Sequence, residues 1–424
     1  MKNYFTRFLD RLIATGDLSI TYPDGDRSRF GDGAGKAVSV EITDRKTLFR
    51  LATNPELALG EAYMDGTLRM EKGSVYDLLE VVFRNTALDE LDGFAGLTHG
   101  ALKFLNRLTG YNSLTKSKMN VAHHYDLSGD LYRLFLDSDS QYSCAYFESA
   151  QDDLEEAQLA KKRHLAAKLL LDPRQKVLDV GSGWGGLGLY LAQHKGVDVT
   201  GVTLSEEQFA ISNSRAQEAE LNAQARFELR DYRTIQGRFD RIVSVGMFEH
   251  VGPKSYDEFF SKMHELLEDD GVMTLHYIGQ TTTPSHTNPW IVKYIFPGGY
   301  IPSLSEVLPA IERSGLMMTD VETLRLHYAE TLKHWRERFM ARRDEAVALY
   351  DERFARMWEF YLASSETGFR YQGLVIHQIQ LARRVDAVPL TRTYIDENKV
   401  SLRESEKAGQ TAAAVRPLRE RQAG

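Results

Sequence analysis

A glycine-rich turn carries the clearest chemical signal in this sequence. Residues 177–186 begin with an apolar run that contains Asp179 and continue as Gly-Ser-Gly-Trp-Gly-Gly, so a buried strand is predicted to end at this turn. Gly181, Gly183 and Gly185 allow positive φ and let the backbone approach a ligand closely. A helical pattern follows. The segment therefore predicts a nucleotide-like cofactor at the carboxyl end of a parallel strand.

Two classes of cofactor use such a turn, the dinucleotides and S-adenosylmethionine. A dinucleotide-binding turn is followed after about 20 residues by an acidic side chain for the ribose. Here the next predicted strand leads into Thr203, Leu204 and Ser205 and on to Gln208, with no carboxylate at the strand tip. Trp184 inside the turn would also crowd a pyrophosphate. The pattern hydrophobic-Asp-x-Gly-x-Gly-x-Gly is similar to motif I of class I S-adenosylmethionine-dependent methyltransferases, which favours the second cofactor.

Polar side chains also gather where other predicted strands and loops end. They lie in segments 123–128, 141–147, 246–252 and 276–279. Ligands of open α/β sheets bind beyond the carboxyl ends of strands, which places Glu249, His250 and His276 where chemistry occurs. Each segment also has a structural interpretation. His276 could be a hydrogen-bonded core residue, Glu249 a helix cap and Cys144 a small buried apolar residue.

The elements that would position these groups begin with a small N-terminal α+β domain, residues 1–110, which is expected to associate with lipid or membrane. Its predicted strands are Leu18–Tyr22 and Ala37–Ile42, and its predicted helices are Lys46–Asn54 and Val75–Asn85. Turn-forming residues around an aromatic side chain predict a loop over Gly60–Gly66.

Residues 111–395 are predicted to form the catalytic domain, with the α/β fold of a class I methyltransferase and a Rossmann-like mixed sheet. Two long amphipathic helices are predicted over 331–348 and 351–364. Residues 396–424 turn polar and rich in small residues, which predicts a disordered tail. The predicted strands are Lys176–Asp179, Asp198–Val202, Ala225–Leu229, Arg241–Val245, Val272–Ile278, Met317–Leu324 and Leu374–Leu381.

Between the two domains, residues 93–125 contain no Asp or Glu. Lys103, Arg107, Lys116 and Lys118 lie beside apolar residues at helical spacing. Such a segment suits a helix that lies on an anionic lipid surface, and it equally suits a linker helix that packs on the core. Both interpretations stay open at the level of sequence.

Composition limits the classes of function. A net charge of −8 argues against nucleic acid as a partner, and no apolar run approaches the length of a membrane span. The N-terminus lacks the apolar core of an export signal, and the single cysteine fits a reducing compartment. We therefore expect a cytoplasmic protein that associates peripherally with the inner face of the membrane. The histidine spacing and the single cysteine predict no metal site.

The motifs taken together resemble the cyclopropane-fatty-acyl-phospholipid synthase family, which includes the mycolic acid cyclopropane synthases. The resemblance runs from about His123 to Arg384, and the N-terminal domain resembles the extra domain of the phospholipid-acting members. It rests on the runs His124–Asp126, Tyr142–Phe147, Val180–Gly185, Thr203–Gln208, Phe248–His250 and Tyr294–Gly299.

This resemblance implies the roles of individual residues. The residues implied to surround S-adenosylmethionine are Tyr142, Ser143, Asp179, the turn with Gly181, Gly183, Trp184 and Gly185, the run Thr203, Leu204, Ser205 and Gln208, and Asp231 with Tyr232. Those implied to hold a bicarbonate ion, and so to be catalytic, are Glu249, His276, Tyr328, Cys144 and Ile278. Cys144 and Ile278 would act through their backbones.

The implied reaction is cyclopropanation of unsaturated acyl chains in a phospholipid bilayer, with bicarbonate as the proton acceptor. Aromatic residues of the motifs, among them Phe248 and Phe296, are expected to face a cationic intermediate. The alternatives are a methyl- or methylene-branched product, methylation of a small amine, and a non-catalytic lipid-binding module. The family also suggests a homodimer. One departure is that Ser364 and Ser365 occupy a stretch where many phospholipid-acting members carry a cysteine.

Overall fold

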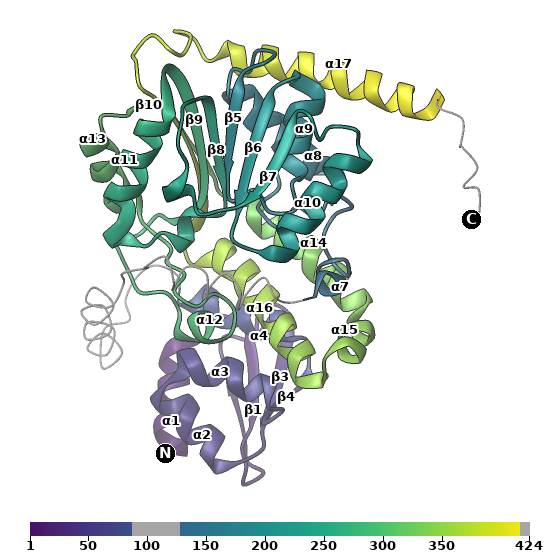
Figure 1. The fold of residues 1–424 in the computed structure, drawn as a ribbon. Helices are drawn as coiled ribbons and strands as arrows, with labels where there is room; N and C mark the ends of the chain where they lie inside the picture. The colour runs from purple at the N-terminus through teal and green to yellow at the C-terminus, as the bar shows by residue number, and fades with distance from the viewer. Residues whose placement is uncertain (87–127, 416–424) are drawn as a thin grey trace.

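The computed structural model describes residues 1–86 and 128–415, which form two sheets with their helices (Figure 1). The smaller sheet belongs to the N-terminal domain and has the strand order β2-β1-β3-β4. Alternate residues of β1 and β3, such as Leu18, Ile20 and Val40, point into its core, as expected for a sheet with one covered face. The elements are α1 Lys2–Leu12, β1 Asp17–Thr21, β2 Arg27–Phe30, β3 Ala37–Ile42, α2 Arg45–Thr53, α3 Pro55–Met64, β4 Leu68–Lys72 and α4 Val75–Asn85.

Local sequence explains most of these boundaries. Asp44 caps α2 through the backbone N–H of Thr47, and Ser74 forms a reciprocal capping box with Asp77 at the start of α4. The expected loop over Gly60–Gly66 is wrong, because α3 runs through Gly60 to Met64. Gly60 serves close packing, since a Cβ there would lie 2.4 Å from Nε1 of Trp290.

Seven strands form the larger sheet, in the order β10-β11-β9-β8-β5-β6-β7. Strands β9, β8, β5, β6 and β7 pair in parallel, whereas β11 pairs antiparallel with β9 and β10. The predicted α/β class with a mixed sheet is therefore confirmed. The strands are β5 Lys176–Val180, β6 Asp198–Thr203, β7 Ala225–Leu229, β8 Phe239–Val245, β9 Leu267–Gln280, β10 Met317–Leu324 and β11 Leu374–Ala382.

Helices cover both faces of this sheet (Figure 1). Successive residues of β5 separate the two cores, because Val177 packs with α8, α9 and α10 while Leu178 packs with α11 and α13. These helices are α8 Leu154–Lys168, α9 Gly186–Lys195, α10 Glu206–Glu218, α11 Tyr256–Leu266 and α13 Leu304–Ser314.

A third group of helices lies between the larger sheet and the N-terminal domain (Figure 1). Helix α16 contacts α14 of the catalytic domain and also α3 and α4 of the N-terminal domain. The helix expected over 331–348 is divided at Arg342, and the one expected over 351–364 continues to Tyr371. The group comprises α7 Gly129–Tyr132, α12 Pro289–Tyr294, α14 His327–Ala341, α15 Arg343–Leu349 and α16 Glu352–Tyr371.

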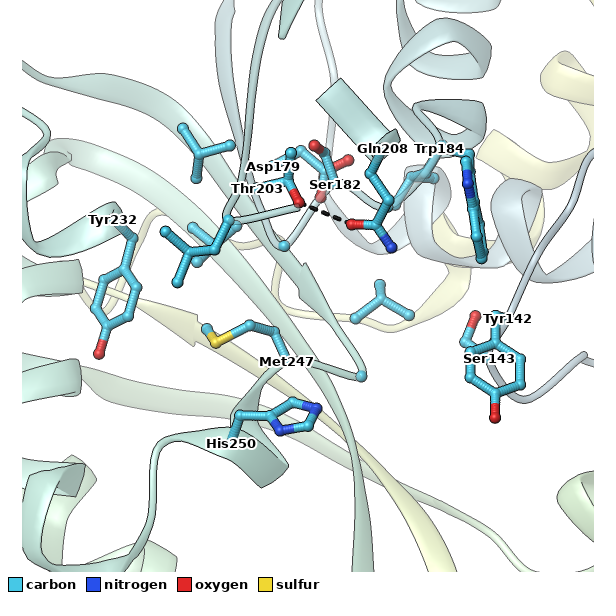
Figure 2. A pocket seen from close by; sticks show the side chains of 18 of the residues that line it. Tyr142, Ser143, Asp179, Ser182, Trp184, Thr203, Gln208, Tyr232, Met247 and His250 are labelled. Carbon is cyan, nitrogen blue, oxygen red and sulfur yellow. Dashed lines mark hydrogen bonds between the residues drawn. The ribbon is translucent and has the colours of Figure 1, made fainter. Parts of the chain in front are cut away.

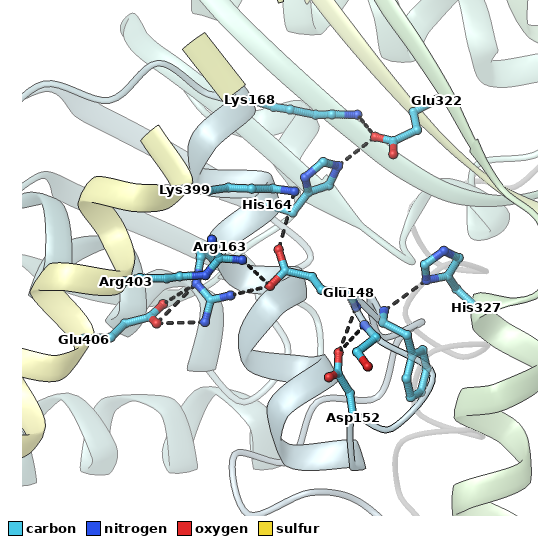
Figure 3. A network of polar contacts seen from close by, with 12 residues as sticks. Glu148, Asp152, Arg163, His164, Lys168, Glu322, His327, Lys399, Arg403 and Glu406 are labelled. Atoms are coloured by element: carbon cyan, nitrogen blue, oxygen red, sulfur yellow. Dashed lines mark hydrogen bonds and ion pairs between the residues drawn. The ribbon is translucent and has the colours of Figure 1, made fainter. Parts of the chain in front are cut away.

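Residues 396–415 of the tail that was expected to be disordered instead belong to helix α17, Thr393–Val415, and residues 416–424 lie outside the described residues. This helix packs on α8, and Leu402 is fully buried between them. Arg163 of α8 forms an ion pair with Glu406 of α17 at 2.8 Å, while Arg403 of α17 reaches Glu148 (Figure 3). The composition misled the prediction, because Tyr394, Ile395 and Leu402 of this helix are buried against the domain, although Val400 is exposed. The segment 93–125 lies outside the described residues.

Candidate active site

A pocket lies at the carboxyl ends of β5, β6 and β8, where the glycine turn leaves the sheet (Figure 2). Gly185 and Ser205 do not line the pocket themselves. They are the N-caps of α9 and α10, next to residues that do. The structure thus brings the expected cofactor residues together around one pocket. Those that line it are Tyr142, Ser143, Asp179, Gly181, Gly183, Trp184, Thr203, Leu204, Gln208, Asp231 and Tyr232.

The glycine turn takes a backbone shape that other residues would disturb. Gly181 and Gly185 have φ values of +86° and +83°. A Cβ on Gly181 would lie 2.7 Å from Cβ of Met247, and one on Gly185 would lie 2.8 Å from Cζ of Phe227. Glycine is required at both positions for the left-handed backbone and for the close packing. The backbone itself then forms one wall of the pocket.

The tip of β6 presents neutral polar groups to the pocket. The hydroxyl of Thr203 donates to Oε1 of Gln208 at 2.7 Å, which fixes the orientation of that amide (Figure 2). Ser205 caps α10 by accepting from the backbone N–H of Gln208 at 3.3 Å. This local network explains how Thr203 and Gln208 are positioned where a carboxylate would stand in a dinucleotide site.

Two carboxyl groups in the pocket differ in their surroundings. Asp231 is held by Arg233, whose Nη2 donates at 2.7 Å. Asp179 is buried at the end of β5, and its Oδ2 has no hydrogen-bond partner among the described residues. Burial raises the pKa of Asp179 to about 7. Asp179 therefore has an acceptor directed at whatever fills the pocket.

Sequence analysis missed Lys161, a pocket residue of α8 that is only 1% exposed. Its ammonium group donates to Oγ of Ser143 at 2.8 Å and to Oε1 of Gln141 at 2.6 Å. A helix that carries several buried lysines gives no local sign of which lysine reaches a ligand. Only the packing of α8 against the segment around Ser143 selects Lys161.

Glu249, Ile278 and His276 form a second polar group beside the pocket. Glu249 lies in the short 3-10 helix Phe248–His250 after β8, and its Oε1 accepts from the backbone N–H of Ile278 at 2.6 Å. Nδ1 of His276 is hydrogen-bonded to the amide of Gln378 at 3.1 Å. Oε2 of Glu249 and Nε2 of His276 have no partner among the described residues. These two buried polar atoms can therefore bind a ligand or solvent.

Burial also sets the charge of this group. It raises the pKa of Glu249 to about 7 and lowers the pKa of His276 to about 3. His276 is therefore a neutral ring at neutral pH, with one nitrogen held by Gln378. His250, whose ring points into the pocket, is likewise kept neutral, because burial lowers its pKa to about 4 (Figure 2).

Cys144 and Tyr328 lie on two segments that are joined by a hydrogen bond. The backbone N–H of Ala145, next to Cys144, donates to Thr331 on the first turns of α14 at 3.0 Å, and Tyr328 begins the same helix. Burial raises the pKa of the Cys144 thiol well above its usual value, so the thiol stays neutral.

The expected aromatic residues divide into two groups. Tyr142 and Tyr361 share a hydrogen bond of 2.8 Å between their hydroxyl groups, and the ring of Phe296 lies 6.0 Å from that of Tyr361. Phe248, in contrast, is fully buried against Tyr256 and α11, so its expected role toward an intermediate is wrong. Phe248 serves the core of the sheet.

The strand order, the glycine turn and the pocket at the switch between β5 and β8 define a class I methyltransferase. The chain belongs to the mycolic acid cyclopropane synthetase family, whose model matches residues 112–379. A domain of unknown function matches residues 5–88, within the N-terminal domain.

Relatives of known name support this assignment. The chain is 38% identical to the cyclopropane-fatty-acyl-phospholipid synthase of Escherichia coli over 342 residues, 80% of this chain and 86% of the relative. It is 34% identical to the tuberculostearic acid methyltransferase of Mycobacterium tuberculosis over 398 residues, 89% of this chain and 90% of the relative. Both matches extend beyond the catalytic domain.

Solved structures agree with the fold. The cyclopropane synthase MmaA2 from Mycobacterium tuberculosis superposes with a TM-score of 0.60 at 35% identity, covering 62% of this chain and 98% of that one. The mycolic acid cyclopropane synthase CmaA1, solved with SAH and CTAB, gives a TM-score of 0.59 at 37% identity, covering 62% of this chain and 97% of that one.

Proposed function

We propose that this protein uses S-adenosylmethionine to convert unsaturated acyl chains of membrane phospholipids into cyclopropane chains, with bicarbonate as the proton acceptor. The observation that carries the proposal is the similarity to the Escherichia coli synthase across 80% of the chain. The intact pocket supports it. An alternative without catalysis would have no need for the glycine turn or for the Thr203–Gln208 pair.

The pocket fits the proposed cofactor, which supplies an electrophilic methyl group when bound. The backbone at Gly181 and Gly183 allows close contact, and Thr203 with Gln208 offers oriented polar groups to a ribose. Asp231 and Tyr232 lie beyond β7, where the adenine ring of the cofactor could lie against the aromatic ring of Tyr232. The residues present therefore suit each part of S-adenosylmethionine.

The second polar group fits a bicarbonate ion, which would supply the base for the proton that leaves the transferred methyl carbon. The fit rests on Oε2 of Glu249 and Nε2 of His276, which are buried and have no partner among the described residues. Glu249 can accept the ion's hydroxyl proton, while the nearby backbone N–H groups and Tyr328 can donate. A small anion with both donor and acceptor atoms matches this mixed set.

The environment of the substrate also suits the proposed reaction. An alkene is a weak nucleophile, and its attack on a methyl group leaves a carbocation that water would trap. Tyr142, Tyr361 and Trp335 form an aromatic cluster, and their rings can stabilise positive charge without supplying a nucleophile.

We infer peripheral association with the inner face of the membrane as part of this function. None of the helices in the described parts of the chain is long and apolar enough to cross a bilayer. A phospholipid substrate nevertheless requires contact with the lipid surface, and the basic segment 93–125 is the sequence feature that suits it. The homodimer suggested by the family also stays a proposal.

A second candidate product is a methyl-branched chain. It is favoured by the 34% identity with the tuberculostearic acid methyltransferase over 89% of this chain. Ring closure and methylene branching share the cofactor, the first carbon–carbon bond and the loss of one proton, whereas a saturated methyl branch also needs hydride from a separate reductant. Retention of Glu249, His276 and Tyr328 provides for proton loss and therefore favours the ring over direct formation of the methyl branch.

Mass analysis of fatty acid methyl esters, before and after hydrogenation under mild conditions that reduce double bonds and leave the ring intact, separates these products. Bacteria that lack cyclopropane fatty acids would express the wild-type chain, with empty vector as a control. A ring adds one CH₂ and removes the double bond, a methylene branch adds one CH₂ and keeps unsaturation, and a methyl branch adds CH₂ and two further hydrogens. Absence of any modified acyl chain, with folded protein present, would contradict the proposal.

A further inference from the structure

Helix α8 buries three lysines, of which two have an anionic partner. The ammonium group of Lys162 lies 2.5 Å from the carboxylate of Asp139. Lys168 forms ion pairs with Glu322 at 2.5 Å and with Asp320. No carboxylate of the described residues lies within ion-pair distance of Lys161, although Lys161 is 1% exposed. A buried charge without a counterion is costly, so an anion is the expected partner of Lys161.

The position of Lys161 indicates where that anion binds. Lys161 is part of the pocket wall, and its ammonium group holds Ser143 and Gln141 of the same wall. An ammonium has three N–H donors, and none of the described residues accepts from the third. Because Oγ of Ser143 accepts from Lys161, the hydroxyl proton of Ser143 can donate to a ligand. Two donors therefore converge at this end of the pocket.

The two ends of the pocket differ chemically. Figure 2 shows Tyr232 and Ser143 at opposite sides. The Tyr232 side offers an aromatic ring beside the neutral groups of β6, as a nucleoside requires. On the other side Lys161 holds Ser143, and Lys161 lies within electrostatic range of Asp179, which supplies one cation and one acid. The methionine end of S-adenosylmethionine carries the matching pair, a carboxylate and an ammonium group.

We propose that Lys161, together with the hydroxyl group of Ser143, binds the carboxylate of the methionine end of S-adenosylmethionine. Asp179 faces the ammonium group of the same end. This inference rests on the proposed cofactor and adds to it a residue that recognises the amino-acid part. The bound carboxylate then supplies the counterion that the buried lysine lacks.

The pKa of Lys161 adds a second, independent signature. Burial lowers this pKa to about 8. A bound carboxylate favours the protonated lysine, so the preference for S-adenosylmethionine over its decarboxylated form should fall as the pH rises above about 8. The titratable groups around Lys161 are Asp137, Asp139 and Cys144 before α8, Lys162 on α8, Asp179 on β5 and His276 on β9.

Calorimetry with two ligands tests the inference in the full-length protein. S-adenosylmethionine and its decarboxylated form differ only in the carboxylate. We expect Lys161→Met to weaken binding of the first roughly ten- to a hundredfold, the range for a hydrogen bond to a charged group, and to leave the second nearly unchanged. Lys161→Arg should recover part of the loss. The control is Lys162→Met, which removes a neighbouring buried lysine, 8% exposed, that lies outside the pocket wall.

Each result has a defined meaning. Equal losses for both ligands in Lys161→Met, or no loss for either, would overturn the role of Lys161. If Lys161→Met does not fold, the wild-type protein decides the question, because its preference for the carboxylated ligand must fall above about pH 8. A preference independent of pH would also overturn the inference. Failure of the wild-type protein to bind S-adenosylmethionine would instead contradict the proposed function.

Discussion

At the scale of single residues, Glu249 is held by one backbone hydrogen bond and buried at its second oxygen. Glu249→Gln keeps the shape and can still accept from Ile278, but an NH₂ donor can replace the acceptor at Oε2. We expect S-adenosylmethionine affinity to stay within about twofold and turnover to fall on the order of a hundredfold. Calorimetry and acyl-chain analysis measure the two effects, with exposed Glu258→Gln as a control. Normal turnover would refute the bicarbonate assignment.

The same substitution should change how stability depends on pH. Burial raises the pKa of Glu249 to about 7, whereas the unfolded value is about 4.3. The folded state binds this proton more tightly, so the contribution to stability is complete below about pH 4 and is lost as the pH rises through about 7. Glu249→Gln is neutral throughout. It should therefore gain up to about 4 kcal/mol in free energy of unfolding relative to wild type above pH 7.

Denaturant titrations at several pH values measure this difference in buffer free of carbon dioxide and cofactor. The advantage of Glu249→Gln over wild type should grow between about pH 5 and about pH 7 and then level off. A difference that does not change with pH would show that Glu249 ionises freely in the folded protein.

At the scale of elements, α17 joins the end of the chain to the helix that carries Lys161. Leu402→Ala should lower the free energy of unfolding by roughly 2–5 kcal/mol, because a fully buried side chain is replaced by a cavity between α17 and α8. Val400→Ala on the exposed side of the same helix should change it by less than about 0.5 kcal/mol. Thermal and denaturant unfolding compare the two. Equal effects would mean that α17 is detached in solution.

At the scale of the whole molecule, one buried carboxylate joins the two domains. Glu61 of α3 accepts from Lys293 at 2.6 Å and from the hydroxyl of Tyr294 at 2.8 Å, at the end of α12. These contacts position the segment that leads to Phe296, close to the aromatic cluster at Tyr361. The N-terminal domain is thus coupled to the wall of the proposed acyl site.

Glu61→Gln should lower the free energy of unfolding by roughly 1–3 kcal/mol, because it weakens buried charge-assisted hydrogen bonds between the two domains. We expect a higher KM for lipid vesicles and unchanged affinity for S-adenosylmethionine, since the cofactor pocket lies in the other domain. The matched control is Asp65→Asn, which breaks the exposed ion pair with Arg353 and should cost at most about 1 kcal/mol. A parallel loss of cofactor affinity would contradict the coupling as described.

The sequence alone determined what depends on short-range pattern. The glycine turn, the apolar strands and the polar residues at strand ends follow from backbone sterics and side-chain periodicity, so the α/β class and the turn could be named in advance. The family resemblance supplied the other predicted pocket residues and the roles of Glu249 and His276. Their buried, partnerless atoms came only from the structure, because burial depends on every element packed around them.

Tertiary structure decided the features that local pattern leaves ambiguous. Gly60 lies within a helix, where Trp290 from a distant part of the sequence packs too closely to allow a side chain. Helix α17 is ordered because its buried apolar residues pack on α8. Lys161 differs from Lys162 and Lys168 in its partners, because it contacts the hydroxyl group of Ser143 whereas the other two contact carboxylates. Neighbours far along the chain set desolvation and pairing, which is why the sequence marked the turn but not the lysine beside it.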